Sequence, residues 1–77
     1  MNTYIYSLTE TLHEGKTTLV MLPTVDGEIG VLPHHMPLVT TLKKGLVHLT
    51  ESETKKEIPI SGGFAYTDGK NLVVLAD

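Results

Sequence analysis

Short runs of alternating apolar and polar residues, separated by turn residues, extend along the whole chain. The runs are rich in Val, Ile, Leu, Thr and Tyr, and their even spacing is typical of an all-β sandwich or barrel. No stretch carries the apolar period of a three-turn helix. The pattern predicts eight short strands, at 3–8, 17–22, 28–32, 38–42, 46–50, 57–61, 63–67 and 71–75.

Turn residues lie between the predicted strands. Asp-Gly pairs at 26–27 and 68–69 predict tight hairpins, because Asp and Gly tolerate the positive φ that such turns require. Glu14-Gly15 is also predicted to be a turn. The polar segment 51–57 is interpreted as a solvated hairpin tip, and Ser61-Gly62-Gly63 as a bulge or corner between two strands.

The composition supports a single β domain over residues 1–77. The chain has 77 residues, of which 22 are Val, Ile or Thr and only two are Ala, a balance that favours sheet over helix. Hydrophobic residues make up 40% and charged residues 19%, which is too apolar for a disordered chain. Cys is absent, so neither a disulfide nor a thiolate metal site stabilises the domain.

Charge argues against a nucleic-acid partner. The formal net charge is −3 and all six basic residues are Lys, so the bidentate donor that phosphate and base recognition prefers is missing. The longest purely apolar run, at 72–76, is far too short to span a membrane. The first residues have neither the basic nor the apolar stretch of a signal peptide. A soluble, intracellular domain is therefore expected.

Two short motifs imitate catalytic ones. Gly15-Lys16-Thr17 resembles the end of a phosphate-binding P-loop, but Glu10 stands where the first Gly is needed, and no helix is predicted to follow. A turn explains it better. Ser61-Gly62-Gly63 is not a nucleophile elbow, because Pro59 stands where the elbow needs Gly. Neither motif predicts catalysis or a cofactor.

Histidines provide one alternative chemistry. A metal site is conceivable from His13, His34, His35 and His48 with Asp26 and Glu28, but their spacing is not diagnostic. Glu28 with His35 could also form an acid–base pair. No nucleophile, base and orienting group can be assembled, so no catalytic, cofactor-binding or metal residue is predicted. A small histidine-based metalloenzyme remains the alternative of the enzyme class.

A stiffened connection is the first place to look for partner contacts. Pro33 and Pro37 bracket His34-His35-Met36, and proline restricts both its own φ and the residue before it. Stiff exposed loops on a sheet scaffold commonly contact partners.

Three blocks of sequence carry a resemblance to a known family. They are the stretch from Gly27 through Thr40 and on through Leu42–Val47, then Ser61–Phe64, and finally Val74–Asp77. Together they resemble the N-terminal β-sandwich domain of the ε subunit of F-type ATP synthases, whose mitochondrial counterpart is called δ. The order and approximate spacing of the blocks match the family over about residues 16–77.

The resemblance implies a flattened sandwich of about eight to ten short, mostly antiparallel strands. It implies a non-catalytic rotor component of the central stalk, which binds the γ subunit and the membrane c-ring and helps to couple ion-driven rotation to ATP synthesis. The expected location is peripheral, on the cytoplasmic face of the bacterial inner membrane or an equivalent organellar membrane.

The resemblance also assigns contact residues. The acidic residue of the family's Gly-Glu-(Leu/Ile)-Gly motif falls on Glu28, and its loop histidine falls on His35. With His34, Met36 and Pro37 they are expected to contact the c-ring or γ. The alternative is that Glu28 and His35 only stabilise the loop.

Departures from the family qualify these expectations. His34 stands where the family usually has Gly, and residues 3–26 are a few residues shorter than in many relatives. The chain ends at Asp77, where longer relatives continue into a two-helix C-terminal domain that regulates ATP hydrolysis. Either a natural short form or a fragment is expected. A stand-alone β adaptor remains a further alternative, and exposed edges and contact surface could cause self-association in isolation.

Overall fold

Nine β-strands form the computed structural model, which describes residues 1–35 and 37–77. Within these residues the chain forms no helix. The strands are β1 (Asn2–Tyr6), β2 (Thr11–Lys16), β3 (Leu19–Thr24), β4 (Gly27–Val31), β5 (Leu38–Leu42), β6 (Gly45–Glu51), β7 (Thr54–Ile60), β8 (Gly63–Thr67) and β9 (Asn71–Ala76). The all-β sandwich predicted from the sequence is thereby confirmed.

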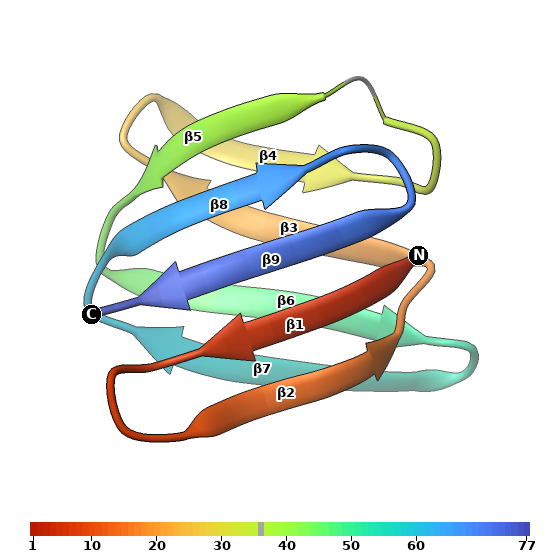
Figure 1. The fold of residues 1–77 in the computed structure, drawn as a ribbon, viewed down its shortest axis with the longest axis horizontal. Coiled ribbons are helices and arrows are strands. Elements are labelled where there is room, and N and C mark those ends of the chain that lie inside the picture. The colour runs from red at the N-terminus through yellow and green to blue at the C-terminus, as the bar shows by residue number, and fades with distance from the viewer. Residues whose placement is uncertain (36) are drawn as a thin grey trace.

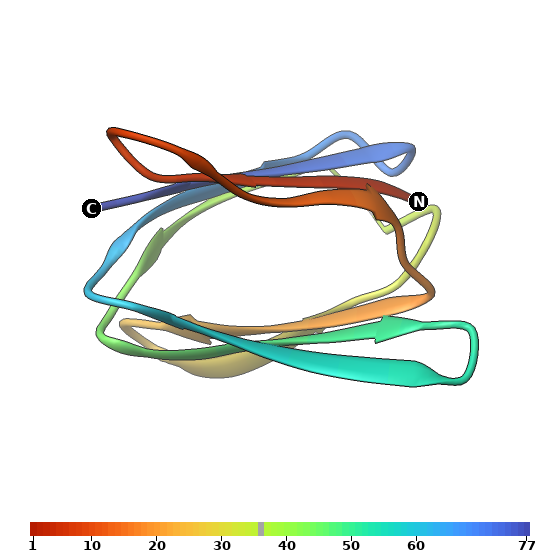
Figure 2. The same cartoon turned by 90° about the horizontal axis from the view of Figure 1, so that it is seen from below.

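The strands are arranged in two layers that face each other (Figures 1 and 2). One layer has the order β2-β1-β9-β8-β5, and the other has β6 between β3 and β7, with β4 on the far side of β3. Every pairing is antiparallel except that of β1 with β9, which is parallel. The domain measures 26 × 23 × 18 Å.

The layers are joined along one side only. There β5 pairs with β3 through a single residue pair, Thr24 with Leu42, and the backbone N–H of Lys43 donates to the Pro23 carbonyl at 2.8 Å. On the opposite side the path ends with β2 in one layer and β7 in the other. β7 carries charged residues and Pro59, both of which discourage pairing of an edge strand with another chain.

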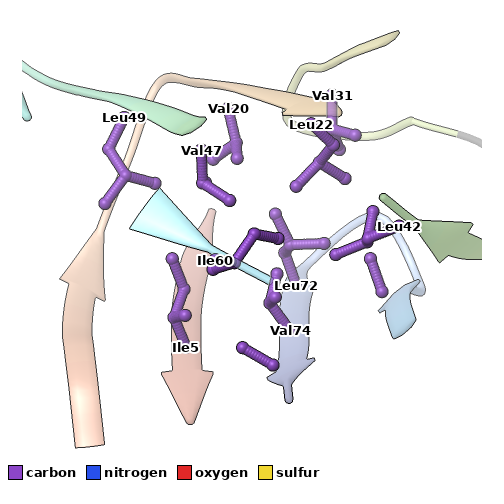
Figure 3. Packing of buried hydrophobic residues seen from close by; sticks show 12 residues of the cluster. Ile5, Val20, Leu22, Val31, Leu42, Val47, Leu49, Ile60, Leu72 and Val74 are labelled. Carbon is purple, nitrogen blue, oxygen red and sulfur yellow. The ribbon is translucent and has the colours of Figure 1, made fainter. Parts of the chain in front are cut away.

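The core lies between the layers and receives side chains from both. Figure 3 shows Val20, Leu22 and Val47 on one side facing Leu72 and Ile5 on the other. All five are completely buried. Burying side chains of this size from both layers is the main favourable term holding the sheets together.

The predicted strands agree with the structure within one or two residues, except near the N-terminus and at β7, which begins at Thr54 and not at residue 57. Those at 38–42 and 63–67 have the bounds of β5 and β8. The strand predicted at 17–22 is wrong in its start, because β3 begins at Leu19. No strand was predicted at 11–16, where β2 lies, and the predicted turn at Glu14-Gly15 falls inside it. Gly15-Lys16-Thr17 is thus the end of a strand and its exit, not a turn.

The turns themselves need smaller corrections. The first Asp-Gly hairpin is confirmed, but its two-residue loop is Val25-Asp26, and Gly27 already pairs with Thr24. The hairpin tip predicted at 51–57 is confined to Ser52-Glu53, since the flanking residues pair between β6 and β7. The corner at Gly62-Gly63 is confirmed. It carries the chain from β7 in one layer to β8 in the other.

Candidate functional site

The outer face of β1, β9, β8 and β5 is largely apolar and aromatic. Its strands alternate, so residues that flank the buried positions point away from the core. In β8 the buried Ala65 lies between two exposed rings, Phe64 and Tyr66. The side chains on this face, which we call the aromatic face, are Tyr4, Tyr6, Val39, Phe64, Tyr66, Val73 and Leu75.

Strand register brings these side chains together. Tyr66 pairs with Val39 on one side and Val73 on the other. Phe64 pairs with Leu75, which in turn pairs with Tyr6. Residues directly opposite each other on neighbouring strands have side chains in contact range. The aromatic face is therefore one continuous surface across four strands.

Much of this surface faces solvent. Val39 is 69% exposed and Phe64 is 57% exposed. The rings of Tyr4 and Tyr6 stack with centroids 6.3 Å apart and planes 8° from parallel. A large exposed apolar patch on a small soluble domain marks a surface that binds another molecule. Aromatic side chains on rigid strands suit a protein interface because they lose little conformational freedom on binding.

A second feature is a groove of about 490 Å³ on the outer face of the other layer. Leu19 and Met21 from β3 line it, with Glu28 from β4 on one side of β3 and His48 from β6 on the other. His48 Nδ1 lies 3.1 Å from Glu57 Oε2 across the β6–β7 pair. Gly30 leaves room for Met21, since a Cβ there would come within 3.0 Å of the Met21 sulfur.

The proline-bracketed loop lies at a different place. His34 is exposed and lines a smaller hollow with Gly69 and Lys70 from the β8–β9 loop. The backbone N–H of His34 donates to the Gly69 carbonyl at 2.8 Å, and that of His35 donates to the Leu32 carbonyl at 3.1 Å. The loop is thus tied both to itself and to the neighbouring loop.

The sequence-predicted contact residues therefore separate into two groups. Glu28 lies in the groove near the β3–β4 turn, at the start of β4, whereas His34 and His35 follow its end. The groove and the hollow share no lining residue. Pro37 is exposed. Met36, also predicted as a contact, lies outside the described residues.

Sequence reasoning did not find the aromatic face. The available signal was that β8 and β9 are apolar at both alternating positions, as in Phe64-Ala65-Tyr66 and in Leu72–Leu75. A strand with one solvated face alternates apolar with polar residues, so apolar residues on both faces indicate two buried or bound surfaces.

Among residues 1–35 and 37–77, no three His, Cys, Asp or Glu side chains gather as metal ligands. Over the same residues no helix is long and apolar enough to cross a bilayer.

Fold and surface together define the class: a small β-sandwich domain that presents a rigid aromatic sheet face and structured loops. Within that class, the family described as "ATP synthase, Delta/Epsilon chain, beta-sandwich domain" matches residues 1–77. The chain belongs to this family, and the resemblance seen in the sequence is confirmed.

Curated relatives agree with this assignment. The chain is 40% identical over 75 residues to the ATP synthase epsilon chain of Dichelobacter nodosus, covering 96% of this chain and 52% of that one. It is 45% identical over 58 residues to the ATP synthase epsilon chain of Carboxydothermus hydrogenoformans, covering 75% and 43%. The chain thus spans about half the length of the relatives it matches.

Solved structures show the same fold. A chain in the Euglena gracilis mitochondrial ATP synthase (OSCP/F1/c-ring) matches with a TM-score of 0.88 and 25% identity, covering 96% of this chain and 48% of that one. A chain of the Tetrahymena thermophila mitochondrial ATP synthase (central stalk/c-ring) matches with a TM-score of 0.81 at 6% identity, covering 97% and 61%. The second likeness bears on the fold alone.

Proposed function

We propose that this domain is a non-catalytic central-stalk (rotor) component of an F-type ATP synthase. It binds the γ subunit and the c-ring, helps to couple ion-driven rotation to ATP synthesis, and is held at the cytoplasmic face of an energy-transducing membrane through the complex. Family membership supports this role, as do relatives named as epsilon chains. The Euglena match comes from an assembly that includes F1 and the c-ring.

The aromatic face is the observation that carries the γ-binding proposal. It has the aromatic content and the rigidity of the core of a protein interface. Phe64 is 57% exposed on this face and lies between Leu75 on β9 and Thr41 on β5. Binding energy in protein interfaces concentrates on a few residues, among which aromatic side chains are enriched.

The ring contact is proposed at the residues that the family motif indicates. Glu28 offers a carboxylate at the exposed wall of the groove. His34, His35, Met36 and Pro37 form a separate contact region in the loop after β4. Because the two regions lie at opposite ends of β4, they reach different parts of the stalk or ring.

Binding to γ is tested by size-exclusion co-migration with the γ subunit of the same organism at micromolar concentration. The wild-type chain should form a stoichiometric complex, and Phe64→Asp should weaken it at least about tenfold. Leu46→Asp is the matched control, because Leu46 is 40% exposed on β6 of the other layer. If the wild-type chain migrates separately from γ, the stalk role is wrong and the stand-alone adaptor is favoured.

The ring contact is tested on the assembled stalk. Glu28→Gln should reduce retention of γ-bound domain on detergent-solubilised c-ring while leaving γ binding unchanged, because the substitution removes only the charge. Retention equal to that of the wild type would show that Glu28 does not contact the ring.

A further inference from the structure

A hollow of about 270 Å³ lies at one end of the sandwich, where four segments meet. Its walls come from the start of β1, the end of β2, the loop after β4 and the β8–β9 loop. In Figure 1 this is the end marked N, where the blue β8–β9 loop approaches the loop after β4. Three side chains that can carry positive charge line it: Lys16, His34 and Lys70.

No carboxylate side chain lines the hollow. None of the ion pairs found among the described residues involves Lys16, His34 or Lys70. Asp68 is the acid next in sequence to the hollow. Its Oδ1 accepts hydrogen bonds from the backbone N–H groups of Lys70 and Asn71, at 2.9 and 2.8 Å, and its side chain is not part of the lining. In a chain of net charge −3, the hollow is a local concentration of cations.

His34 is held there in a strained conformation. Its φ is 68°, in the left-handed region that non-glycine residues seldom adopt. Its N–H bond to the Gly69 carbonyl fixes this geometry. Gly69 permits the close approach, since its φ is 94° and a Cβ would come within 3.0 Å of the His35 carbonyl oxygen. A glycine at 34 would relieve the strain, so the imidazole is kept at a cost, as at functional sites.

We propose that this hollow binds a tetrahedral oxyanion of the phosphate class, either free phosphate or the phosphate end of a phosphomonoester. Lys16 and Lys70 supply charge from opposite walls, and the imidazole of His34 supplies a further N–H donor. Hydrogen bonds between such cations and anionic oxygens are stronger than neutral ones.

Amide NMR titration of the wild-type domain tests this, with sodium sulfate as the first probe. The His34 and Gly69 amide signals should shift saturably at millimolar sulfate. Sodium chloride at matched ionic strength separates binding from screening.

Two variants and a control make the test specific. His34→Gly should weaken sulfate binding about three- to fivefold, and Lys70→Gln should weaken binding by a similar factor. His34→Gly should not unfold the domain, because glycine suits a φ of 68°. Lys55→Gln, in the groove of the other layer, should leave binding unchanged.

The source of the anion is separated by comparing inorganic phosphate, adenosine monophosphate and adenosine. Similar binding of the first two with none of adenosine indicates recognition of the phosphate alone. Tighter binding of the monoester indicates a phosphomonoester ligand. Unsaturable shifts in the wild type, or affinities for sulfate in His34→Gly and Lys70→Gln equal to that of the wild type, would overturn the proposal. These readouts need neither γ nor the c-ring, so they fail or succeed independently of the stalk role.

Discussion

His13 Nδ1 on β2 lies 3.8 Å from Glu51 Oε1 on β6, across the side where the two layers are not joined by strand pairing. The His13 side chain is 3% exposed, and its Nε2 has no hydrogen-bond partner. Glu51 Oε1 is also without a hydrogen bond, although Lys56 Nζ lies 3.7 Å away. The contact links the layers but leaves buried polar atoms unsatisfied, so it stabilises the fold little.

The first prediction is that His13→Leu stabilises the domain. Leucine has a similar size and introduces no buried nitrogen that needs a partner. Removing an unsatisfied buried donor or acceptor should raise the free energy of unfolding by about 1 kcal/mol. Urea denaturation measures it. A loss of stability would mean that the His13–Glu51 pair is favourable despite its geometry, and His13→Leu/Glu51→Leu would then show the coupling.

A second prediction concerns the corner at Gly63. Its φ is 135°, and an added Cβ would overlap the Leu75 carbonyl oxygen on the paired strand β9. Gly63→Ala should therefore lower the free energy of unfolding by about 3 kcal/mol or more, or prevent folding. Gly27→Ala is the matched control, because Gly27 also has positive φ (118°) but nothing within 4 Å of its Cβ position.

The expected cost of Gly27→Ala is about 1 kcal/mol, from backbone strain alone. Thermal melts of both variants followed by circular dichroism give the comparison. Equal losses of melting temperature in Gly63→Ala and Gly27→Ala would show that the steric overlap at Gly63 is relieved by a shift of β9.

The strands that could be predicted are runs rich in β-branched, aliphatic and aromatic residues between turn signals. The predicted bounds of β5 and β8 match the structure, and burial alternates along both strands. In β2 the residues that pair with Ile5 and Thr3 are His13 and Gly15, which carry no apolar signal, although Leu12 packs against the core. That strand is specified by its backbone pairing with β1 and by the hydroxyl contact of Thr3 with Thr17 at 2.7 Å. Such pairings cannot be predicted from the pattern of residues within one strand.

The candidate binding surfaces were harder to predict from the sequence than the fold was. Family motifs indicated Glu28 and His35, which adjoin the two ends of one short strand. The aromatic face needs the β1–β9 and β8–β5 pairings before Tyr6, Leu75 and Val39 become neighbours. The cationic hollow joins Lys16, His34 and Lys70 from three separate segments. Both surfaces arise from sheet topology, which spacing along the chain does not contain.

A third prediction concerns pH. Backbone N–H groups of Asn71 and Lys70 hold the pKa of Asp68 below its ordinary value of 3.8. A lowered folded-state pKa means that the carboxylate contributes stability above the unfolded pKa, and that this is lost as pH falls through the folded pKa. Asp68→Ala should therefore melt at a lower temperature than the wild type at pH 7.

That difference in melting temperature should shrink below about pH 4. Asp68→Asn is the control, because its amide oxygen can still accept the backbone N–H bonds but does not titrate. If the melting temperatures of the wild type and Asp68→Ala differ equally at pH 2.5 and pH 7, the hydrogen bonds that Asp68 accepts in the β8–β9 loop do not depend on the carboxylate charge.

The last prediction is that the isolated domain self-associates through its aromatic face. Without a partner, Phe64, Tyr66 and Leu75 stay in contact with water, and covering apolar surface is favourable by roughly 25 cal/mol per Å². Sedimentation velocity of the wild type should show concentration-dependent dimers or larger species at high micromolar concentration. Phe64→Asp should remain monomeric over the same range, because a charge on this face must be desolvated on association.

Leu46→Asp on the opposite layer should associate like the wild type. If Leu46→Asp suppresses association and Phe64→Asp does not, the free chains meet through the outer face of the β3-β6-β7 layer instead. Because γ would cover the same aromatic face, adding γ should convert the self-associated species into a single complex of the domain with γ. If γ instead binds to a dimer of the domain, the γ-binding surface lies elsewhere on the domain.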